Sequence, residues 1–317
     1  MADTQNEVFK TPVNKIRLFE HGAPGSQNLK LTRKYYTEDM PDGRVKHIVQ
    51  NITDPDIVPY IPDGIGNSTD RQRIPAVLII PGGAFRRLVY NFEGEDVAKW
   101  LNSMGIAAFV LECRLPSDEH DNAEDVPLID AMRAMRVIRG RAQEFGIDEA
   151  KIGVMGFSAG GFMAALLSTA YESDVYADYK YKDEYDKLSA RPDFAVCSYP
   201  VISIDDCIEA GKRYMSEEQV LERISDGKAK ILHKYNPDKL VRPDMPPVFI
   251  CETDDDRTTL SENSVGFYMA ARKAGVSAEL HIFRTGGHGY GCGDDFAQTG
   301  EWKVLFTKWI KSIEIIS

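Results

Sequence analysis

The stretch from 151 to 161 constrains the fold more than any other part of the chain. It contains a short apolar run and then a single serine between small residues, and a second apolar run follows at 162–167. This pattern predicts a strand, a sharp turn and a helix. Gly156, Ser158 and Gly160 have the spacing of a nucleophile elbow, in which bulky neighbours would clash because the backbone approaches itself closely. The elbow would lift the serine hydroxyl out of the sheet and direct the first helical amides toward a bound group. The alternative interpretation is a glycine-rich turn with no catalytic role.

Apolar runs and helical stripes alternate along the chain. Further strands are predicted at 45–52, 76–80, 106–111, 194–199, 248–251 and 278–283. Helices are predicted at 92–104, 128–145, 261–274 and 301–313. Continuous apolar strands that alternate with helices are typical of an α/β fold with a doubly wound, mostly parallel sheet. We expect irregular structure before residue 45 and a loop at 53–74.

The chain of 317 residues shows no internal repeat and no linker, so we expect one domain over 1–317. The segment 204–240 is polar and helical without a deep apolar stripe. It follows a predicted strand and is the best candidate for a small helical cap over a site at the carboxyl ends of the strands.

Composition excludes several classes of protein. The net charge is −11 without a block of Lys or Arg, which argues against nucleic-acid binding, and no apolar run is long enough to span a membrane. No zinc-ligand spacing occurs among the five cysteines, and Cys113, Cys197 and Cys251 lie in or beside strand-like runs, so we expect buried free thiols. The N-terminal residues lack a signal-peptide pattern, which favours a cytoplasmic protein. No oligomeric state is predicted.

A serine hydroxyl is a weak nucleophile and needs a base, which in turn needs an orienting carboxylate. On this architecture the order is serine, acid and histidine, with the last two in loops after late strands. His288 lies among glycines directly after the predicted strand at 278–283. Of the other histidines, we expect His281 to be structural. The rest lie in polar segments and are predicted to be solvated: His21, His47, His120 and His233.

An acidic cluster follows the predicted strand at 248–251. It contains Glu252, Asp254, Asp255 and Asp256. Spacing to the downstream helix favours Asp256 as the orienting carboxylate, and Asp255 remains the alternative. A solvated loop or a weak cation site would also explain the cluster. In the catalytic interpretation, the carboxylate holds the imidazole tautomer and stabilises its charged form.

Backbone amides near Ser158 are candidates for an oxyanion hole. Acyl transfer places negative charge on the carbonyl oxygen, which preorganised N–H groups must meet. We expect one donor at Ala159, directly after the nucleophile, and two more at Gly83 and Ala84, in the loop after the strand at 76–80. An ordinary turn is the alternative reading of this loop. Phe85 and Tyr290 are the candidate substrate-binding side chains.

The sequence resembles the α/β-hydrolase esterases, and more narrowly the bacterial acetyl-xylan-esterase-like carbohydrate esterases. The resemblance is strongest at the elbow, 156–161, and continues through most of the chain. Other matching segments are 94–111, 114–116, 127–131, 188–194, 199–203 and 286–289. Two departures are visible: Ala84 and Phe85 stand where the family usually has Gly and often Tyr, and Glu252 and Asp254 stand where it has His and a small residue.

The resemblance implies an α/β-hydrolase fold and hydrolysis of short acyl esters, typically acetyl groups on xylan-derived oligosaccharides. We therefore expect a serine esterase active in xylan degradation that uses Ser158, His288 and Asp256 and needs no metal or cofactor. The expected partner is a small ester or an acetylated oligosaccharide. A feruloyl or aryl esterase or a peptidase could use the same three groups. A catalytically silent binding protein on the same fold is the alternative from a different class.

Overall fold

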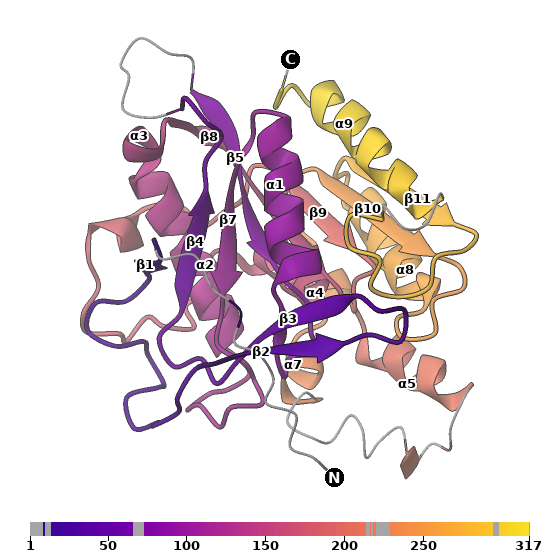
Figure 1. The fold of residues 1–317 in the computed structure, drawn as a ribbon, viewed down its shortest axis with the longest axis horizontal. Coiled ribbons are helices and arrows are strands. Elements are labelled where there is room, and N and C mark those ends of the chain that lie inside the picture. The colour runs from indigo at the N-terminus through magenta and orange to yellow at the C-terminus, as the bar shows by residue number, and fades with distance from the viewer. Residues whose placement is uncertain are drawn as a thin grey trace.

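The computed structural model describes residues 9, 14–65, 73–213, 216, 218–219, 229–293 and 298–316. Its centre is a mostly parallel sheet of eight described strands in the order β1-β4-β7-β5-β8-β9-β10-β11, in which β4 pairs antiparallel with both of its neighbours, β1 and β7, and the other pairs are parallel (Figure 1). The strands are β1 (Ile16–Arg17), β4 (Asp56–Tyr60), β5 (Ile74–Ile80), β7 (Ala107–Glu112), β8 (Ile147–Phe157), β9 (Ala195–Ser198), β10 (Val248–Thr253) and β11 (Ala278–Phe283).

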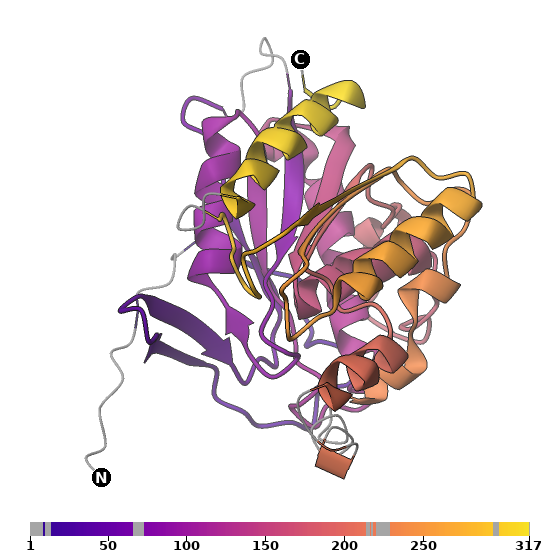
Figure 2. The ribbon, with the colours of Figure 1, turned by 90° about the vertical axis from the view of Figure 1, so that its right-hand side faces the viewer.

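Helices cover both faces of this sheet. Figures 1 and 2 show α1 and α9 on one face and α2, α4 and α8 on the other. Their bounds are α1 (Asp96–Ser103), α2 (Val126–Gly140), α4 (Ala159–Ala170), α8 (Ser261–Lys273) and α9 (Trp302–Ser312). This is the doubly wound α/β architecture predicted from the alternating pattern.

The buried apolar side chains form one connected core, whose members range along the chain from Leu18 to Ile315. The central strand β5 is the clearest case, because Ala76 to Ile79 are fully buried there. A strand with helices on both faces has no solvent side, which explains its uninterrupted apolar run. One shared core supports the prediction of a single domain.

Three expectations about secondary structure were wrong. The predicted loop at 53–74 contains β4, and the region before residue 45 contains β1 and β2 (Lys34–Asp39). Pro59 has no backbone N–H, so it made a strand at this position hard to predict from the sequence. In the structure, β1 pairs only with Asp56 and Ile57 of β4, and no hydrogen bond to β1 requires an N–H at Pro59. β2 joins β3 (Val45–Gln50) and β6 (Leu88–Val89) in a small antiparallel sheet.

The third difference concerns the predicted helix at 128–145. It is interrupted at Arg141, and a short helix, α3 (Ala142–Phe145), follows and ends at Gly146 with φ of +66°. Glycine tolerates this left-handed conformation. α2 itself starts earlier than predicted, at Val126, with Pro127 in its first turn, where the missing proline N–H costs no helical bond.

His120 is also not solvated as predicted. Only 5% of the residue is exposed, and its Nδ1 lies 3.0 Å from Ser26 Oγ. The buried ion pair between Arg114 and Asp130 holds Ser26 and His120 in the interior, since Arg114 also donates a hydrogen bond to Ser26. Burial and the charge of Arg114 lower the pKa of His120 to about 4. The expectation for Cys113, Cys197 and Cys251 is confirmed, because all three are buried free thiols.

The segment 204–240 lies at the end of the sheet where the parallel strands finish (Figures 1 and 2). Its described helices are α5 (Ile204–Lys212) and α7 (Ala229–Lys234), which contact each other. Lys234 and Tyr235 bind the carboxylate of Asp125, at the start of α2, with Lys234 Nζ 2.7 Å from the carboxylate. This position supports the prediction of a cap. Residues 214–215, 217 and 220–228 of the segment lie outside the described part of the chain.

Candidate active site

Ser158 occupies the turn between β8 and α4 with φ of +54° and ψ of −118°. The glycines around it allow this turn. A Cβ at Gly156 would lie 1.9 Å from the carbonyl oxygen of Gly160, and a Cβ at Gly160 would lie 2.0 Å from that of Ile80. Any larger residue would separate β8, α4 and β5, so the glycine requirement inferred from the sequence has a direct steric cause. The conformation of Ser158 is strained for a non-glycine residue, as strained residues at functional sites often are.

Ser158, His288 and Asp256 form one hydrogen-bonded line. Ser158 Oγ lies 2.9 Å from His288 Nε2, and His288 Nδ1 lies 2.7 Å from Asp256 Oδ2. An ionised carboxylate only accepts hydrogen bonds, so the ring N–H must be at Nδ1. Nε2 is then left as the acceptor that faces the serine hydroxyl. The sequence predicted these three residues, and the structure brings all three together.

The carboxylate of Asp256 is buried and held from several sides. Its Oδ1 accepts hydrogen bonds from the amides of Thr258 at 2.7 Å and Thr259 at 3.0 Å, and its Oδ2 accepts one from the Thr259 hydroxyl at 3.0 Å. Burial acts to raise the pKa of Asp256, but the hydrogen bond and charge of His288, with the two amides, hold it below its ordinary value. The group is therefore a carboxylate at neutral pH.

Asp255, the alternative acid, has a different role. Its Oδ1 accepts a hydrogen bond from the amide of Gly287 at 2.8 Å. This bond ties the acidic loop to the loop that carries His288, residues 284–293, which we call the histidine loop. The geometry therefore favours Asp256 over Asp255. Within the described residues, no group of three or more His, Cys, Asp or Glu side chains is arranged to hold a metal ion.

The loop after β5, residues 81–84, lies against the nucleophile, and we call it the oxyanion loop. A Cβ at Gly82 would come within 2.9 Å of Ser158 Cβ. Gly83 and Ala84 have positive φ values of 134° and 57°. Within the described part of the chain, the amides of Gly83, Ala84 and Ala159 donate to no protein acceptor. Such N–H groups beside a nucleophile are available to a developing oxyanion.

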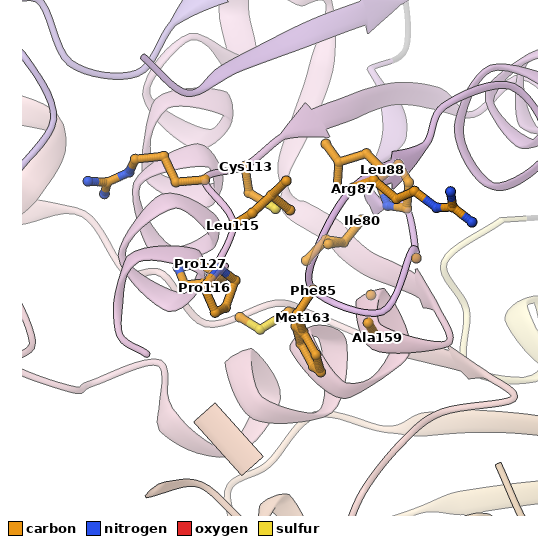
Figure 3. Close-up of a pocket in the computed structure, with 14 residues that line it drawn as sticks. Ile80, Phe85, Arg87, Leu88, Cys113, Leu115, Pro116, Pro127, Ala159 and Met163 are labelled. Atoms are coloured by element: carbon orange, nitrogen blue, oxygen red, sulfur yellow. The ribbon is translucent and has the colours of Figure 1, made fainter. Parts of the chain in front are cut away.

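The two candidate substrate-binding residues have different positions. Phe85 lines a small cavity with Ala159 and Met163, and Figure 3 shows its ring beside the Met163 side chain. Tyr290 does not share this cavity. It is only 4% exposed, and its ring packs against Tyr199 at a centroid distance of 4.5 Å. The structure thus places Tyr290 in the core below the histidine loop, because its apolar ring is covered there.

Sequence reasoning missed two buried residues beside the site, Glu93 and Tyr199. Glu93 lies in a wide helical turn, Asn91–Glu95, and looked like an ordinary polar helix residue. Tyr199 directly follows β9, the strand next to the one that leads into Ser158. Its position at the carboxyl end of a central strand was the available signal, since sites in such sheets gather at that edge.

Glu252, another departure from the family pattern, is a fully buried carboxyl at the end of β10. It accepts hydrogen bonds from the amide of Thr253 at 2.9 Å and the hydroxyl of Ser264 at 3.3 Å, and no Lys or Arg in the described part of the chain forms an ion pair with it. Burial, with the neighbouring charge of Asp256, raises the pKa of Glu252 well above its ordinary value. Glu252 is therefore protonated in the folded protein at pH values where the unfolded chain has already lost this proton.

This difference predicts how stability changes with pH. The unfolded chain releases the Glu252 proton near the ordinary value of 4.5, whereas the folded protein retains it, so stability is lost as pH rises above that value. Glu252→Gln removes this loss, and its melting temperature relative to wild type should increase from pH 4.5 to pH 8. Glu262→Gln, at an exposed position in α8, is the control. A difference between Glu252→Gln and wild type that does not change with pH would contradict this account.

A serine at a strand-to-helix elbow, followed by an acid and a histidine after late strands of a mostly parallel sheet, defines an α/β-hydrolase. The BD-FAE family model matches residues 65–270, and the chain belongs to this family. A crystal structure of an acetyl ester-xyloside bifunctional hydrolase from Caldicellulosiruptor lactoaceticus is 34% identical, with a TM-score of 0.72 over 96% of this chain and 97% of that one. The carboxylesterase Cest-2923 from Lactobacillus plantarum, at 20% identity and a TM-score of 0.68 over 90% and 99% of the two chains, shares the fold.

Two curated relatives are similar over most of this chain. An acetylxylan esterase from Xylanibacter ruminicola is 31% identical over 240 residues, which are 75% of this chain and 45% of the relative. Endo-1,4-beta-xylanase B from Butyrivibrio fibrisolvens is 31% identical over 227 residues, 71% of this chain and 34% of the relative. The chain thus spans less than half the length of either. These similarities confirm the predicted resemblance to acetyl-xylan-esterase-like α/β-hydrolases. No helix among the described residues is both long and apolar enough to cross a membrane.

Proposed function

We propose that the protein is a serine carboxylesterase that removes short acyl groups, chiefly acetyl, from xylo-oligosaccharides or related sugars. The observation that carries this proposal is the line from Ser158 Oγ through His288 to Asp256, with successive distances of 2.9 and 2.7 Å. The names of the relatives, an acetylxylan esterase and an acetyl ester-xyloside hydrolase, support the substrate.

In the proposed reaction, Ser158 Oγ attacks the ester carbonyl carbon while His288 Nε2 takes the hydroxyl proton. The carbonyl oxygen becomes an oxyanion held by the amides of Gly83, Ala84 and Ala159. His288 then returns the proton to the departing sugar oxygen, which leaves an acyl-serine. A water molecule gives a proton to His288 and attacks this ester. The same proton then returns to Ser158, and the acid is released.

A small apolar cavity supports a short acyl group. It lies beside the oxyanion loop and has a volume of about 20 Å³, which is room for about one water-sized group such as a methyl. Phe85 and Met163 are among its walls, together with Ala159 of the elbow (Figure 3). A longer acyl chain would have to displace one of these side chains.

Met163→Ala tests this size limit. Removing the thioether enlarges the cavity, so kcat/KM for p-nitrophenyl butyrate relative to acetate should rise by about tenfold, the effect of one or two added methylenes in a pocket. Met132→Ala is the control, because Met132 is equally buried in α2 but does not line the cavity. An unchanged butyrate-to-acetate ratio in a folded Met163→Ala variant would contradict the role of the cavity.

The natural substrate is best tested by measuring product release from acetylated xylo-oligosaccharides, feruloyl-arabinose esters and peptides with the same enzyme preparation. We expect acetate release with the highest kcat/KM. Faster release of ferulate or of an amine would instead favour the feruloyl esterase or peptidase alternative, since the three catalytic groups do not determine the acyl group.

The buried free thiols Cys113, Cys197 and Cys251 support a cytoplasmic location, which cell fractionation would test.

A further inference from the structure

Two buried polar side chains, Glu93 and Tyr199, connect the oxyanion loop to the histidine loop. We infer that they are positioning residues, which hold the amides for the oxyanion and the imidazole of His288 in fixed relation to each other. The inference rests on the proposed function, because it assigns these residues to the same reaction. It is carried by three hydrogen bonds and by the steric confinement of Gly82.

Glu93 holds the oxyanion loop. Its Oε2 accepts a hydrogen bond from the amide of Gly82 at 2.9 Å. A Cβ at Gly82 would lie 2.6 Å from Glu93 Oε2 and 2.9 Å from Ser158 Cβ, so this glycine is confined between the carboxylate and the nucleophile. Because the Gly82 amide is used by Glu93, its peptide plane is fixed. The next two amides, of Gly83 and Ala84, are the proposed oxyanion donors.

Tyr199 holds the histidine loop. Its hydroxyl donates to Glu93 Oε1 at 2.9 Å and accepts from the amide of Gly291 at 3.0 Å. Its ring meets the His288 ring edge to face, with centroids 5.1 Å apart. Tyr199 adopts φ of +36°, an uncommon conformation for a bulky residue that its surroundings must enforce. The connection thus runs from Gly82 through Glu93 and Tyr199 to Gly291, three residues after His288.

Glu93 is an unusual choice of residue for a purely structural link between two loops. The residue is only 5% exposed, and among the described residues no Lys or Arg forms an ion pair with it. Burying a carboxylate without a paired cation is costly, and a neutral side chain could link two loops at less cost. Burial raises the pKa of Glu93, and a positive charge on His288 acts in the opposite direction.

Glu93→Gln is the first test. Glutamine offers one acceptor and one donor where Glu93 accepts two hydrogen bonds, so one of the two links must break. We expect kcat for p-nitrophenyl acetate to fall about 10- to 100-fold with KM within threefold of wild type, because misaligned oxyanion donors weaken transition-state binding rather than substrate binding. The matched control is Glu95→Gln in the same turn, since Glu95 pairs only with Lys99 among the described ion pairs. Its kcat should stay within twofold of wild type.

Tyr199→Phe provides an independent second test. It keeps the ring packing against His288 and removes only the hydroxyl that joins Glu93 to Gly291. We expect a fall in kcat of similar size with unchanged KM. The rate of Ser158 labelling by a fluorophosphonate should fall with it, since phosphonylation uses the same oxyanion donors but no natural ester. Melting temperatures measured alongside ensure that both variants are compared as folded proteins. If Glu93→Gln does not fold, Tyr199→Phe decides the question.

The outcomes separate this inference from the proposed function. Wild-type kcat and labelling rates in both folded variants, while Ser158→Ala is inactive, would overturn the inference and leave the esterase proposal standing. A lower kcat with little change in KM in Glu93→Gln and Tyr199→Phe, but not in Glu95→Gln, would support the inference. A wild-type protein that neither hydrolyses esters nor reacts with the fluorophosphonate would overturn the proposed function, and the inference with it.

Discussion

Ser158→Ala is expected to lower kcat for p-nitrophenyl acetate by a factor on the order of 10⁴ or more, because no other group can form the acyl intermediate. The fold should survive. Ser158 already occupies its strained backbone conformation, and alanine adds no atoms to the confined elbow. The measurement is initial rate at saturating substrate, with circular dichroism and melting temperature as checks on the fold.

A second serine, in the helix that follows Ser158, gives a matched control for this variant. Ser168 is fully buried in α4 and its hydroxyl donates to the carbonyl of Ala164 at 2.7 Å. Ser168→Ala removes a hydroxyl of the same kind at a distance from the turn, so it should retain activity within about twofold. Comparable activity in wild type and Ser158→Ala would show that hydrolysis does not proceed through this serine.

The second large effect is expected at Asp256. Asp256→Asn replaces a carboxylate with a side chain that can donate to His288 Nδ1 and so favours the wrong tautomer, which should lower kcat by roughly 10³- to 10⁴-fold. Asp255→Asn should change kcat by less than about threefold, because the asparagine Oδ1 can still accept the hydrogen bond from Gly287. Steady-state kinetics of the two variants decides between the acids. A larger loss in Asp255→Asn would reverse the assignment.

The lowered pKa of Asp256 adds a pH dependence to the same pair of variants. The folded protein releases this proton at a lower pH than the unfolded chain, so the carboxylate stabilises the fold above the unfolded pKa. That stability is lost as pH falls through the folded value. The difference in unfolding free energy between wild type and Asp256→Asn should therefore be constant near neutral pH and shrink in acid. A difference that grows in acid would contradict it.

Much of the fold could be predicted because each central element carries its own pattern. The central buried strands of the parallel part of the sheet contain uninterrupted apolar runs. The elbow is marked in the sequence by the spacing of Gly156 and Gly160, and the structure shows that a side chain at either position would clash with the backbone. The strands that were not predicted, β1, β2 and β4, lie outside the parallel part of the main sheet. β4 pairs antiparallel at the edge of the parallel region and contains Asp56 and Pro59, so neither a continuous run nor an alternating one marks it.

The candidate site shows the same division. The positions of Ser158, Asp256 and His288 could be predicted, because chain order on this architecture places them after three parallel strands of the sheet, β8, β10 and β11. Glu93 and Tyr199 could not, because their contact spans 106 residues and depends on how two loops approach at the end of the sheet. Tyr290 was expected to contact the substrate, but neighbouring residues in a loop can point in opposite directions. Its ring is covered by Tyr199.

The central claim is that Ser158 is the nucleophile of an esterase. Its most direct test is mass spectrometry of the protein after brief reaction with a fluorophosphonate, followed by proteolysis and sequencing of the modified peptide. The predicted result is one phosphonyl group per chain on Ser158, no modification of Ser158→Ala, and loss of esterase activity in proportion to labelling. Modification at another residue, or full activity in protein whose Ser158 is modified, would contradict the claim.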